Sequence, residues 1–214
     1  MGSRDIGPNE TDDRDADAEL MLAFQRGDED AFGALVRRFQ DRIVSLAYRY
    51  LGSAADAEDL AQEVFLRVYR AKGSYEPSAR FSTWIYRIAS NTSLNHIRGR
   101  KARRKVAGPL PSPDEGDPAS DPADPDAAAP GDRLEMDELA RVLRQIVDDL
   151  PDRQRIAILL NKYEGLGYEE VAAAMDLSVM AVKSLLTRAR VNIKERLEPY
   201  LTSGEFGAST TRNR

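Results

Sequence analysis

Cysteine is absent from this 214-residue chain, and histidine occurs once, as His96. Without cysteine the protein forms no disulfide, iron–sulfur cluster or thiolate zinc site, and a single imidazole supports little histidine chemistry. No apolar run approaches the roughly 20 residues that a membrane-spanning helix needs. The first 19 residues are acidic and polar, unlike a secretory signal, so we expect a cytoplasmic protein with no membrane insertion of its own.

Sequence patterns for catalysis are missing as well. The chain has no metal-ligand cluster, no nucleophile beside a base and no glycine-rich phosphate loop. We therefore expect no cofactor and no enzymatic activity. An enzyme that uses Asp56, Asp59 and Glu63 as catalytic carboxylates is disfavoured, because these residues are predicted to lie along one exposed helix face.

The net charge of −5 is spread unevenly along the chain. Residues 20–105 carry a net charge of +7 and residues 133–201 one of −1, whereas residues 1–19 carry −5 and residues 106–132 carry −7. A basic folded unit between acidic segments is typical of nucleic-acid-binding proteins whose flexible segments screen their own charge.

The hydrophobic pattern predicts an all-α fold of two small helical domains joined by a flexible, acidic, proline-rich linker. We expect a disordered acidic N-terminus at residues 1–16 and a first domain at residues 17–105. The linker follows at residues 106–132, then a second domain with a helix-turn-helix at residues 133–201 and a disordered tail at residues 202–214. Residues 108–132 hold seven prolines and seven acids, a composition that neither buries a core nor sustains a helix.

Helical patterning and end signals define the expected helices. Helical patterning begins near Asp17. In the first domain the helices lie near residues 20–27, 28–51, 53–72 and 82–98, and in the second near 133–150, 151–163, 167–175 and 179–201. Asp28 is a predicted N-cap, Gly52 follows a helix end, and Ser53 with Asp56 resembles a capping box. We expect Gly73 to close the third helix.

A helix within residues 80–105 carries two different faces and leads into a basic cluster. At about 100° per residue, one face suits a core and holds Phe81, Ile85, Ile88, Ala89 and Thr92. The second stripe holds Trp84, Arg87, Asn91, Asn95 and Arg98. Groups of these kinds stack on unpaired bases, read base edges and hold phosphates. Six of the eight residues 98–105 are basic, counting Arg98 itself. Alternatively, Trp84 belongs to the core and the basic run is a solvated helix end.

Residues 168–190 have the pattern of a helix-turn-helix, with the turn at residues 176–178. The residues spaced to pack together are Val171, Ala172, Met175, Leu177, Val182 and Leu186. The opposite face of the second helix holds Met180, Lys183, Ser184, Thr187, Arg188 and Val191. Such a face can enter a major groove, although a hairpin with a solvated basic face is the alternative.

One face of the helix at residues 53–72 is acidic. The apolar side holds Ala57, Leu60, Ala61, Val64 and Val68, and the other side holds Asp56, Asp59, Gln62, Glu63 and Leu66. Leu66 among carboxylates would form an apolar anchor inside a polar rim, as in a protein interface. The alternative is a solvated face whose first acids favour the helix dipole.

Taken in order, these segments resemble the extracytoplasmic-function (ECF) sigma factors, a compact two-domain class of bacterial transcription initiation factors. The resemblance covers about residues 17–105 and 133–201. Its specific strings are RGDEDAFGALVRRFQDRI, DAEDLAQEVFLRVYRA, FSTWIYRIASN, LPDRQRIAILLNKYEGLGYEEVAAAM and VKSLLTRAR.

The resemblance implies an alternative sigma factor that binds core RNA polymerase and promoter DNA, promotes strand opening for a specific regulon, and is held by an anti-sigma factor. The implied polymerase-binding residues are Asp59, Gln62, Glu63, Phe65 and Leu66. Those implied for the minus-ten element are Arg80, Phe81, Trp84, Arg87, Asn91, Asn95 and Arg98. Those implied for the minus-thirty-five element are Lys183, Ser184, Thr187 and Arg188.

Three departures from the family pattern affect the second domain. The string VKSLLTRAR stands where VKSRLHRAR is frequent, Met180 replaces a common glycine, and Gly167 stands where a hydroxyl cap is usual. These changes bear on which minus-thirty-five sequence is read. A helix-turn-helix regulator that binds duplex DNA as a dimer remains the alternative function.

Overall fold

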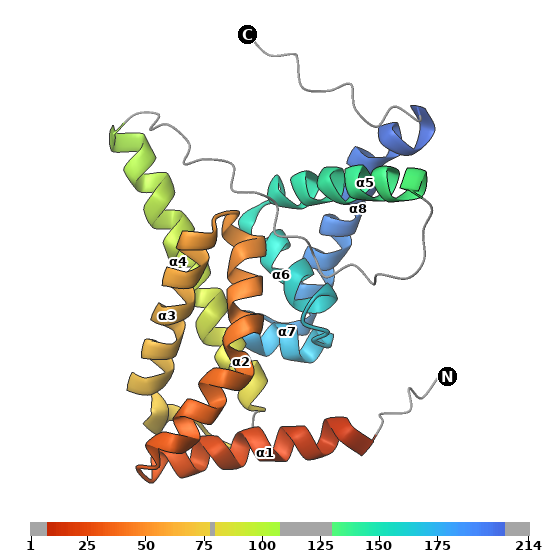
Figure 1. Cartoon of the computed structure of the whole chain (residues 1–214). Coiled ribbons are helices and arrows are strands. Elements are labelled where there is room, and N and C mark those ends of the chain that lie inside the picture. The colour runs from red at the N-terminus through yellow and green to blue at the C-terminus, as the bar shows by residue number, and fades with distance from the viewer. Residues whose placement is uncertain (1–7, 78–79, 108–129, 204–214) are drawn as a thin grey trace.

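A computed structural model describes residues 8–77, 80–107 and 130–203 (Figure 1). Over these ranges the chain folds into eight α-helices and one 3-10 turn, without a strand. The prediction of an all-α fold is confirmed. The predicted linker falls mainly on residues 108–129 and the predicted disordered tail mainly on residues 204–214, all outside the described residues. Of the predicted disordered N-terminus, residues 1–7 also lie outside them, whereas residues 8–16 are helical in this structure.

The first unit contains four helices whose ends follow local capping signals. Asp28 accepts hydrogen bonds from two N–H groups of the helix that it caps, at 3.0 and 3.2 Å, and Gly52 ends that helix with φ 74°. Ser53 Oγ accepts from the N–H of Asp56 at 3.3 Å. The elements are α1 (Pro8–Gln25), α2 (Glu29–Leu51), α3 (Ala54–Arg70), the 3-10 turn η1 (Lys72–Ser74) and α4 (Phe81–Ala107).

The second unit contains four further helices and the predicted turn between two of them. Asp176 adopts the left-handed conformation with φ 53°, and Ser178 Oγ accepts a hydrogen bond from the N–H of Ala181 at 3.2 Å. These two residues end one helix and begin the next. The elements are α5 (Pro130–Asp148), α6 (Asp152–Lys162), α7 (Tyr168–Met175) and α8 (Val179–Ser203).

Two helices are longer than the sequence pattern predicts. Helix α1 begins at Pro8 rather than near Asp17. Proline at the first position of a helix and acidic residues near its start both favour helix formation. Helix α4 continues through the basic run to Ala107, because arginine and lysine are good helix formers and suit the negative C-terminal end. The basic run is therefore part of a helix and does not follow it.

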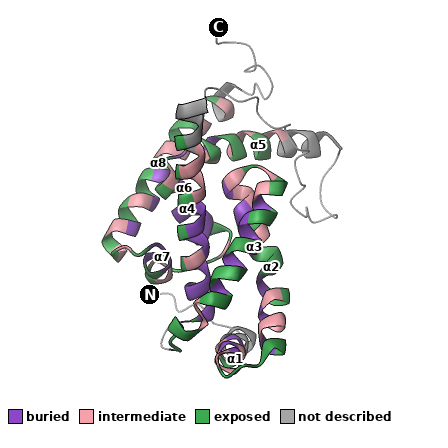
Figure 2. Ribbon diagram, turned by 90° about the vertical axis from the view of Figure 1, so that its left-hand side faces the viewer, coloured by how far each residue is buried: buried purple, intermediate pink, exposed green. Residues whose placement is uncertain are grey.

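The core of the first unit forms where α2, α3 and α4 face one another (Figure 2). Helix α2 buries a residue about every third or fourth position: Ala31, Leu35, Phe39, Ile43, Leu46, Ala47 and Tyr50. This spacing puts one apolar stripe of α2 against its neighbours.

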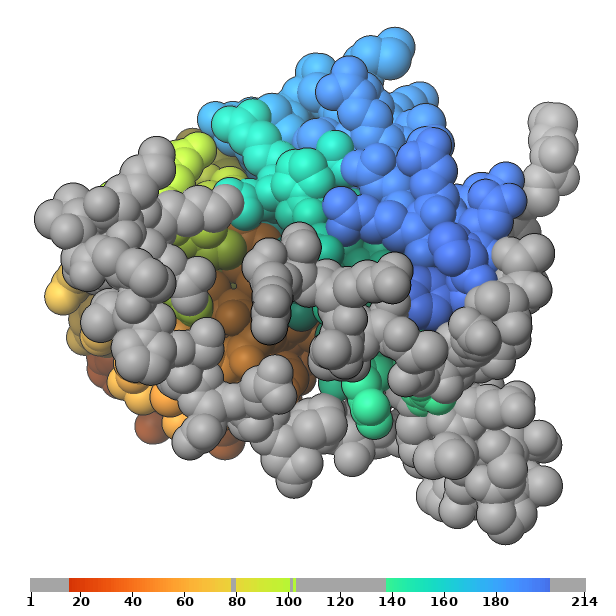
Figure 3. Space-filling model, turned by 90° about the horizontal axis from the view of Figure 1, so that it is seen from above, coloured from red at the N-terminus to blue at the C-terminus, as the bar shows by residue number. Residues whose placement is uncertain are grey.

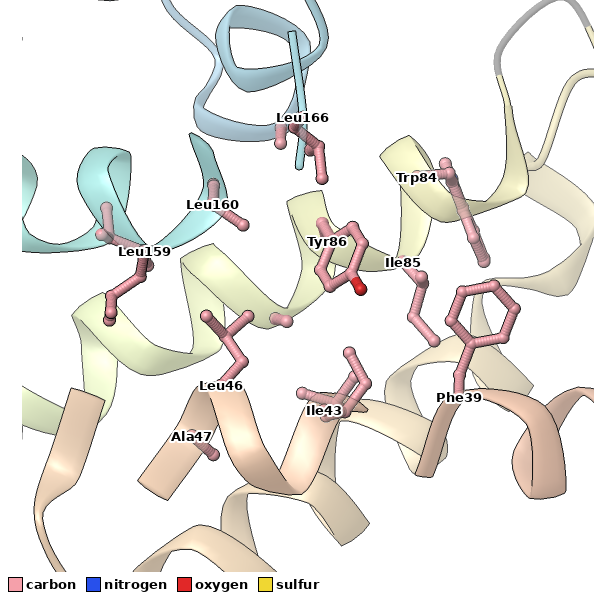
Figure 4. Close-up of a cluster of buried hydrophobic side chains, with 14 of the residues drawn as sticks. Phe39, Ile43, Leu46, Ala47, Trp84, Ile85, Tyr86, Leu159, Leu160 and Leu166 are labelled. Atoms are coloured by element: carbon pink, nitrogen blue, oxygen red, sulfur yellow. The ribbon is translucent and has the colours of Figure 1, made fainter. Parts of the chain in front are cut away.

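The two units pack directly against each other. Helix α7 lies on α4, and α6 contacts both α2 and α4 (Figure 1). In Figure 3 the turquoise atoms of the second unit adjoin the yellow-green and brown atoms of the first unit. In Figure 4 the ring of Tyr86, on α4, lies between Ile43 of α2 and Leu160 and Leu166 of the second unit. All four side chains are buried in one hydrophobic cluster that spans both units.

Charged groups also join the units. The Glu164 carboxylate accepts a hydrogen bond from the Tyr86 hydroxyl and pairs with Arg42 at 3.1 Å, and its side chain is only 7% exposed. The Arg155 guanidinium donates to the carbonyl of Arg49 at 2.7 Å and also pairs with Asp148 of its own unit. These contacts add directional bonds to the apolar interface.

Candidate polymerase and DNA interfaces

The acidic face of α3 is exposed along most of its length. We define the α3 face as Asp59, Gln62, Glu63 and Leu66, all of which are exposed. Leu66 keeps 55% of its surface accessible, more than any other large apolar side chain of α3. Arg67 Nη2 holds the Glu63 carboxylate at 2.6 Å, so that this acid is oriented beside Leu66.

Phe65 does not belong to the α3 face. Its side chain is only 9% exposed and lies in the hydrophobic cluster with Leu60 and Val64. One residue step of about 100° turns Phe65 away from Leu66 and toward the core. In this structure Phe65 is therefore not accessible to a partner, and its predicted polymerase contact stays a prediction.

The polar stripe of α4 is exposed as predicted. We define the α4 stripe as Arg87, Asn91, Asn95 and Arg98, all of which are exposed. Arg80, just before the helix, is exposed too. The stripe presents guanidinium and amide groups, which donate to phosphates and to base edges.

The aromatic residues predicted to accompany this stripe are buried. Trp84 is 5% exposed and Phe81 1% exposed. The Trp84 ring centroid lies 5.5 Å from that of Tyr75 and 6.0 Å from that of Phe81. In this arrangement the Trp84 ring is therefore not accessible to an unpaired base, because the ring of the loop residue Tyr75 packs edge-on against the indole. Base stacking by Trp84 stays a prediction.

The helix-turn-helix lies next to the α4 stripe. A pocket of ≈ 170 Å³ separates them, lined by Asn91, Leu94, Asn95, Arg98, Arg153, Met175, Asp176 and Leu177. At the other end of α4, Arg80 pairs with Glu170 of α7. The amide-bearing part of the stripe thus faces the second unit at short range.

The outer face of α8 points into solvent. We define the α8 face as Met180, Lys183, Ser184, Thr187 and Arg188, all of which are exposed. Its inner side is held by Val182, Leu186 and Ala189, which are at most 1% exposed. The predicted division of this helix into a core side and an outer side is confirmed.

Sequence reasoning did not find the residues that join the two units. Tyr86 and Glu164 are 78 positions apart, and Arg80 and Glu170 are 90 apart. No local periodicity relates such positions. The only signal was chemical: Glu164 is an acidic residue among the apolar and small residues of the α6–α7 connection.

Family models match both units. The model of Sigma-70 region 2 matches residues 35–103, which include α3 and most of α4. The model of Sigma-70 region 4 matches residues 140–193, which include the helix-turn-helix. The chain is also 37% identical over 188 residues to the RNA polymerase sigma-H factor of Pseudomonas aeruginosa, with 88% of this chain and 97% of the relative covered. It is 35% identical over 185 residues to the ECF RNA polymerase sigma-E factor of Escherichia coli K12, with 86% and 96% covered.

The chain belongs to the ECF sigma factors. As an alternative sigma factor it promotes promoter recognition for the initiation of transcription, and sigma factors are initiation factors that are not catalysts by themselves. The resemblance to this family that the sequence motifs indicate is confirmed.

Solved structures share the fold of this ECF sigma factor. The structure of CnrH in complex with the cytosolic domain of CnrY has a TM-score of 0.62 at 26% identity, covering 86% of this chain and 98% of that chain. The sigma factor RpoE of Bartonella quintana, solved with the anti-sigma factor NepR, has a TM-score of 0.61 at 21% identity, covering 78% and 96%. Among the described residues, no helix has the length and apolar character needed to cross a membrane.

Proposed function

We propose that this ECF sigma factor docks on core RNA polymerase through the α3 face. The observation that carries the proposal is Leu66, an accessible apolar group bordered by Asp59, Gln62 and Glu63. An apolar anchor in a polar rim is the usual anatomy of a specific protein interface. The ion pair from Arg67 reduces the side-chain entropy that Glu63 would lose on docking.

The exposed groups before and along α4 bind the opened minus-ten element. Arg80 and Arg98 would hold phosphates, and the amides of Asn91 and Asn95 would read the edges of unstacked bases. The buried rings of Phe81 and Trp84 would support α4 from beneath and leave base contact to the polar groups. Unstacking a base costs a few kcal/mol, which such contacts offset for the preferred base.

The α8 face reads the minus-thirty-five element in the major groove. Lys183 and Arg188 supply charge for phosphates or guanine, while Ser184 and Thr187 can bond either partner of a base pair. Polymerase performs the chemistry, so this chain contributes recognition and strand opening in the cytoplasm. An anti-sigma factor is the proposed inhibitor, supported by the complexes in which the related folds were solved.

Co-purification with bacterial core polymerase tests the proposal. The double variant Glu63→Lys, Leu66→Ala should bind core at least about thirtyfold more weakly than wild type, as expected for loss of a hot spot of about 2 kcal/mol. Glu58→Lys is the matched control, because Glu58 is an exposed acid on the same helix but lies roughly 90° around from the α3 face.

Two results would reject this assignment. Equal loss of binding in Glu58→Lys would show that helix charge in general matters and the α3 face does not. Wild-type protein that ignores core polymerase and binds duplex DNA as a dimer would indicate the helix-turn-helix regulator.

A further inference from the structure

Met180 is the most exposed large apolar side chain in the described part of the chain, with 75% of its surface accessible. It is the second residue of α8 and lies two positions after Ser178, whose hydroxyl caps the helix. With three quarters of its surface accessible, Met180 contributes little burial to the stability of its own fold. Its place at the start of the second helix of the helix-turn-helix, together with this exposure, points to a binding role.

Helix geometry places Met180 within the surface proposed to enter the groove. At about 100° per residue, Met180, Lys183, Ser184 and Thr187 occupy one side of α8 at spacings of three, four and seven residues. All four are exposed. In helix-turn-helix proteins it is the N-terminal residues of the second helix that reach base edges, and Met180 lies in that first turn.

The surroundings of Met180 fit DNA better than a protein partner. The first turn of α8 holds no acidic residue, and Lys183 and Arg188 are exposed on the same helix. The positive charge of this surface favours binding to a phosphate backbone. Met180, an apolar side chain on the same surface, needs an apolar partner within the groove.

Base edges in the major groove offer one apolar group, the 5-methyl of thymine. The Met180 thioether is flexible, donates no hydrogen bond and accepts only weakly, so it covers a methyl group well but pairs poorly with the polar edges of guanine, adenine or cytosine. We propose that Met180 is a specificity determinant that selects thymine at one position of the minus-thirty-five element. This inference rests on the proposed function of the α8 face.

Replacement of thymine by deoxyuridine tests the contact, because it removes only the methyl group. Holoenzyme, made from the full chain and core polymerase, first selects its upstream element from a randomised duplex. Each thymine of that element is then replaced in turn, and duplex affinity is measured with wild type and Met180→Ala. Wild type should lose about fourfold at one position, the value of one buried methyl-sized group, and Met180→Ala should lose nothing there.

Two control variants separate this effect from general weakening. Val191→Ala shortens another exposed apolar side chain of α8, which is 47% exposed and three turns further along, and should keep the fourfold preference for thymine. Lys183→Ala should weaken binding to both the thymine duplex and the deoxyuridine duplex. The ratio of the two affinities should stay unchanged, because a lysine contact to phosphate does not depend on the methyl group.

The outcomes separate this inference from the function on which it rests. If wild-type holoenzyme selects no upstream element, the proposed role of the α8 face fails and the inference fails with it. If an element is selected but contains no thymine, or if Met180→Ala keeps the wild-type preference, only the inference is overturned. It is also overturned if Met180→Ala weakens core polymerase binding while the thymine preference persists, since Met180 would then contact protein.

Discussion

Trp84 shows how a single residue decides between two interpretations of α4. On a helical projection it falls between the core face and the exposed stripe, so periodicity alone leaves it undecided. Tyr75 settles its position, because this ring lies 5.5 Å from the indole and covers it. Phe65 poses the same problem on α3, where it borders both the core and Leu66. Sequence patterns assign the centre of each face correctly but leave its edges to tertiary contacts.

Burial of Trp84 predicts a fluorescence result. It is the single tryptophan of the chain, so the intrinsic emission reports on this site alone. We expect blue-shifted emission that iodide quenches poorly, and no change when single-stranded minus-ten DNA binds. Trp84→Ala should lower the free energy of unfolding by about 3–5 kcal/mol, as for other large core truncations, measured by urea denaturation. Strong quenching by iodide, relieved by the DNA, would restore the base-stacking interpretation.

The buried tyrosines predict how stability depends on alkaline pH. Burial raises the pKa of Tyr86. The Glu164 carboxylate raises this pKa further, because it would repel the phenolate and because it accepts a hydrogen bond from the protonated hydroxyl. Burial likewise raises the pKa of Tyr50. In the unfolded chain tyrosine loses its proton near pH 10, so the unfolded state then binds fewer protons than the folded state. Stability is therefore complete below about pH 10 and falls as pH rises further.

The variant Tyr86→Phe isolates the contribution of Tyr86 to this pH dependence of stability. The wild-type free energy of unfolding should fall above pH 10 more steeply than that of Tyr86→Phe, by up to about 1.4 kcal/mol per pH unit. Chemical denaturation at several pH values between 9 and 11 measures both slopes. Equal slopes would mean that Tyr86 ionises in the folded protein as it does in the unfolded chain.

Whole elements were predicted well wherever local chemistry determines them. The caps at Asp28, Gly52 and Ser53 lie where expected, since each depends on residues a few positions away. The end of α4 was predicted too early, because composition suggested a basic cluster and hid the good helix propensity of arginine and lysine. Local signals thus set starts and stops, while a charge cluster can conceal a continuing helix.

The extension of α4 beyond Arg98 predicts the effect of changing Gly99. This glycine lies inside the helix, and a Cβ added there meets no atom within 4 Å. Gly99→Ala should therefore stabilise the protein by about 0.5–1 kcal/mol, since glycine is costly in a helix interior. Gly52→Ala should instead destabilise it, because Gly52 has φ 74°. Thermal unfolding compares the two, and no gain in Gly99→Ala would indicate that α4 ends earlier.

At the scale of the whole molecule, sequence analysis predicted the two units but not their contact. Helix faces repeat every few residues and are visible in the sequence, whereas the pairing of Tyr86 with Glu164 spans 78 positions. The contact makes the two proposed DNA surfaces unequal in this structure. The α8 face is open to solvent, while the amides of the α4 stripe line the pocket shared with the helix-turn-helix. The stripe is exposed, but a DNA strand that follows its whole length needs more room than this pocket of ≈ 170 Å³, so we expect such binding to move the units apart.

Weakening the contact between the units should widen the pocket beside the α4 stripe. Glu164 joins Tyr86 and Arg42 from a side chain that is 7% exposed, so Glu164→Ala removes a buried carboxylate and leaves the Tyr86 hydroxyl and the Arg42 guanidinium without it. We expect a larger radius of gyration by small-angle X-ray scattering and tighter binding of single-stranded minus-ten DNA by the free chain. Glu169→Ala, on an exposed acid of α7, is the matched control and should change neither quantity. Scattering that expands without any gain in DNA affinity would mean that the second unit does not restrict access to the stripe.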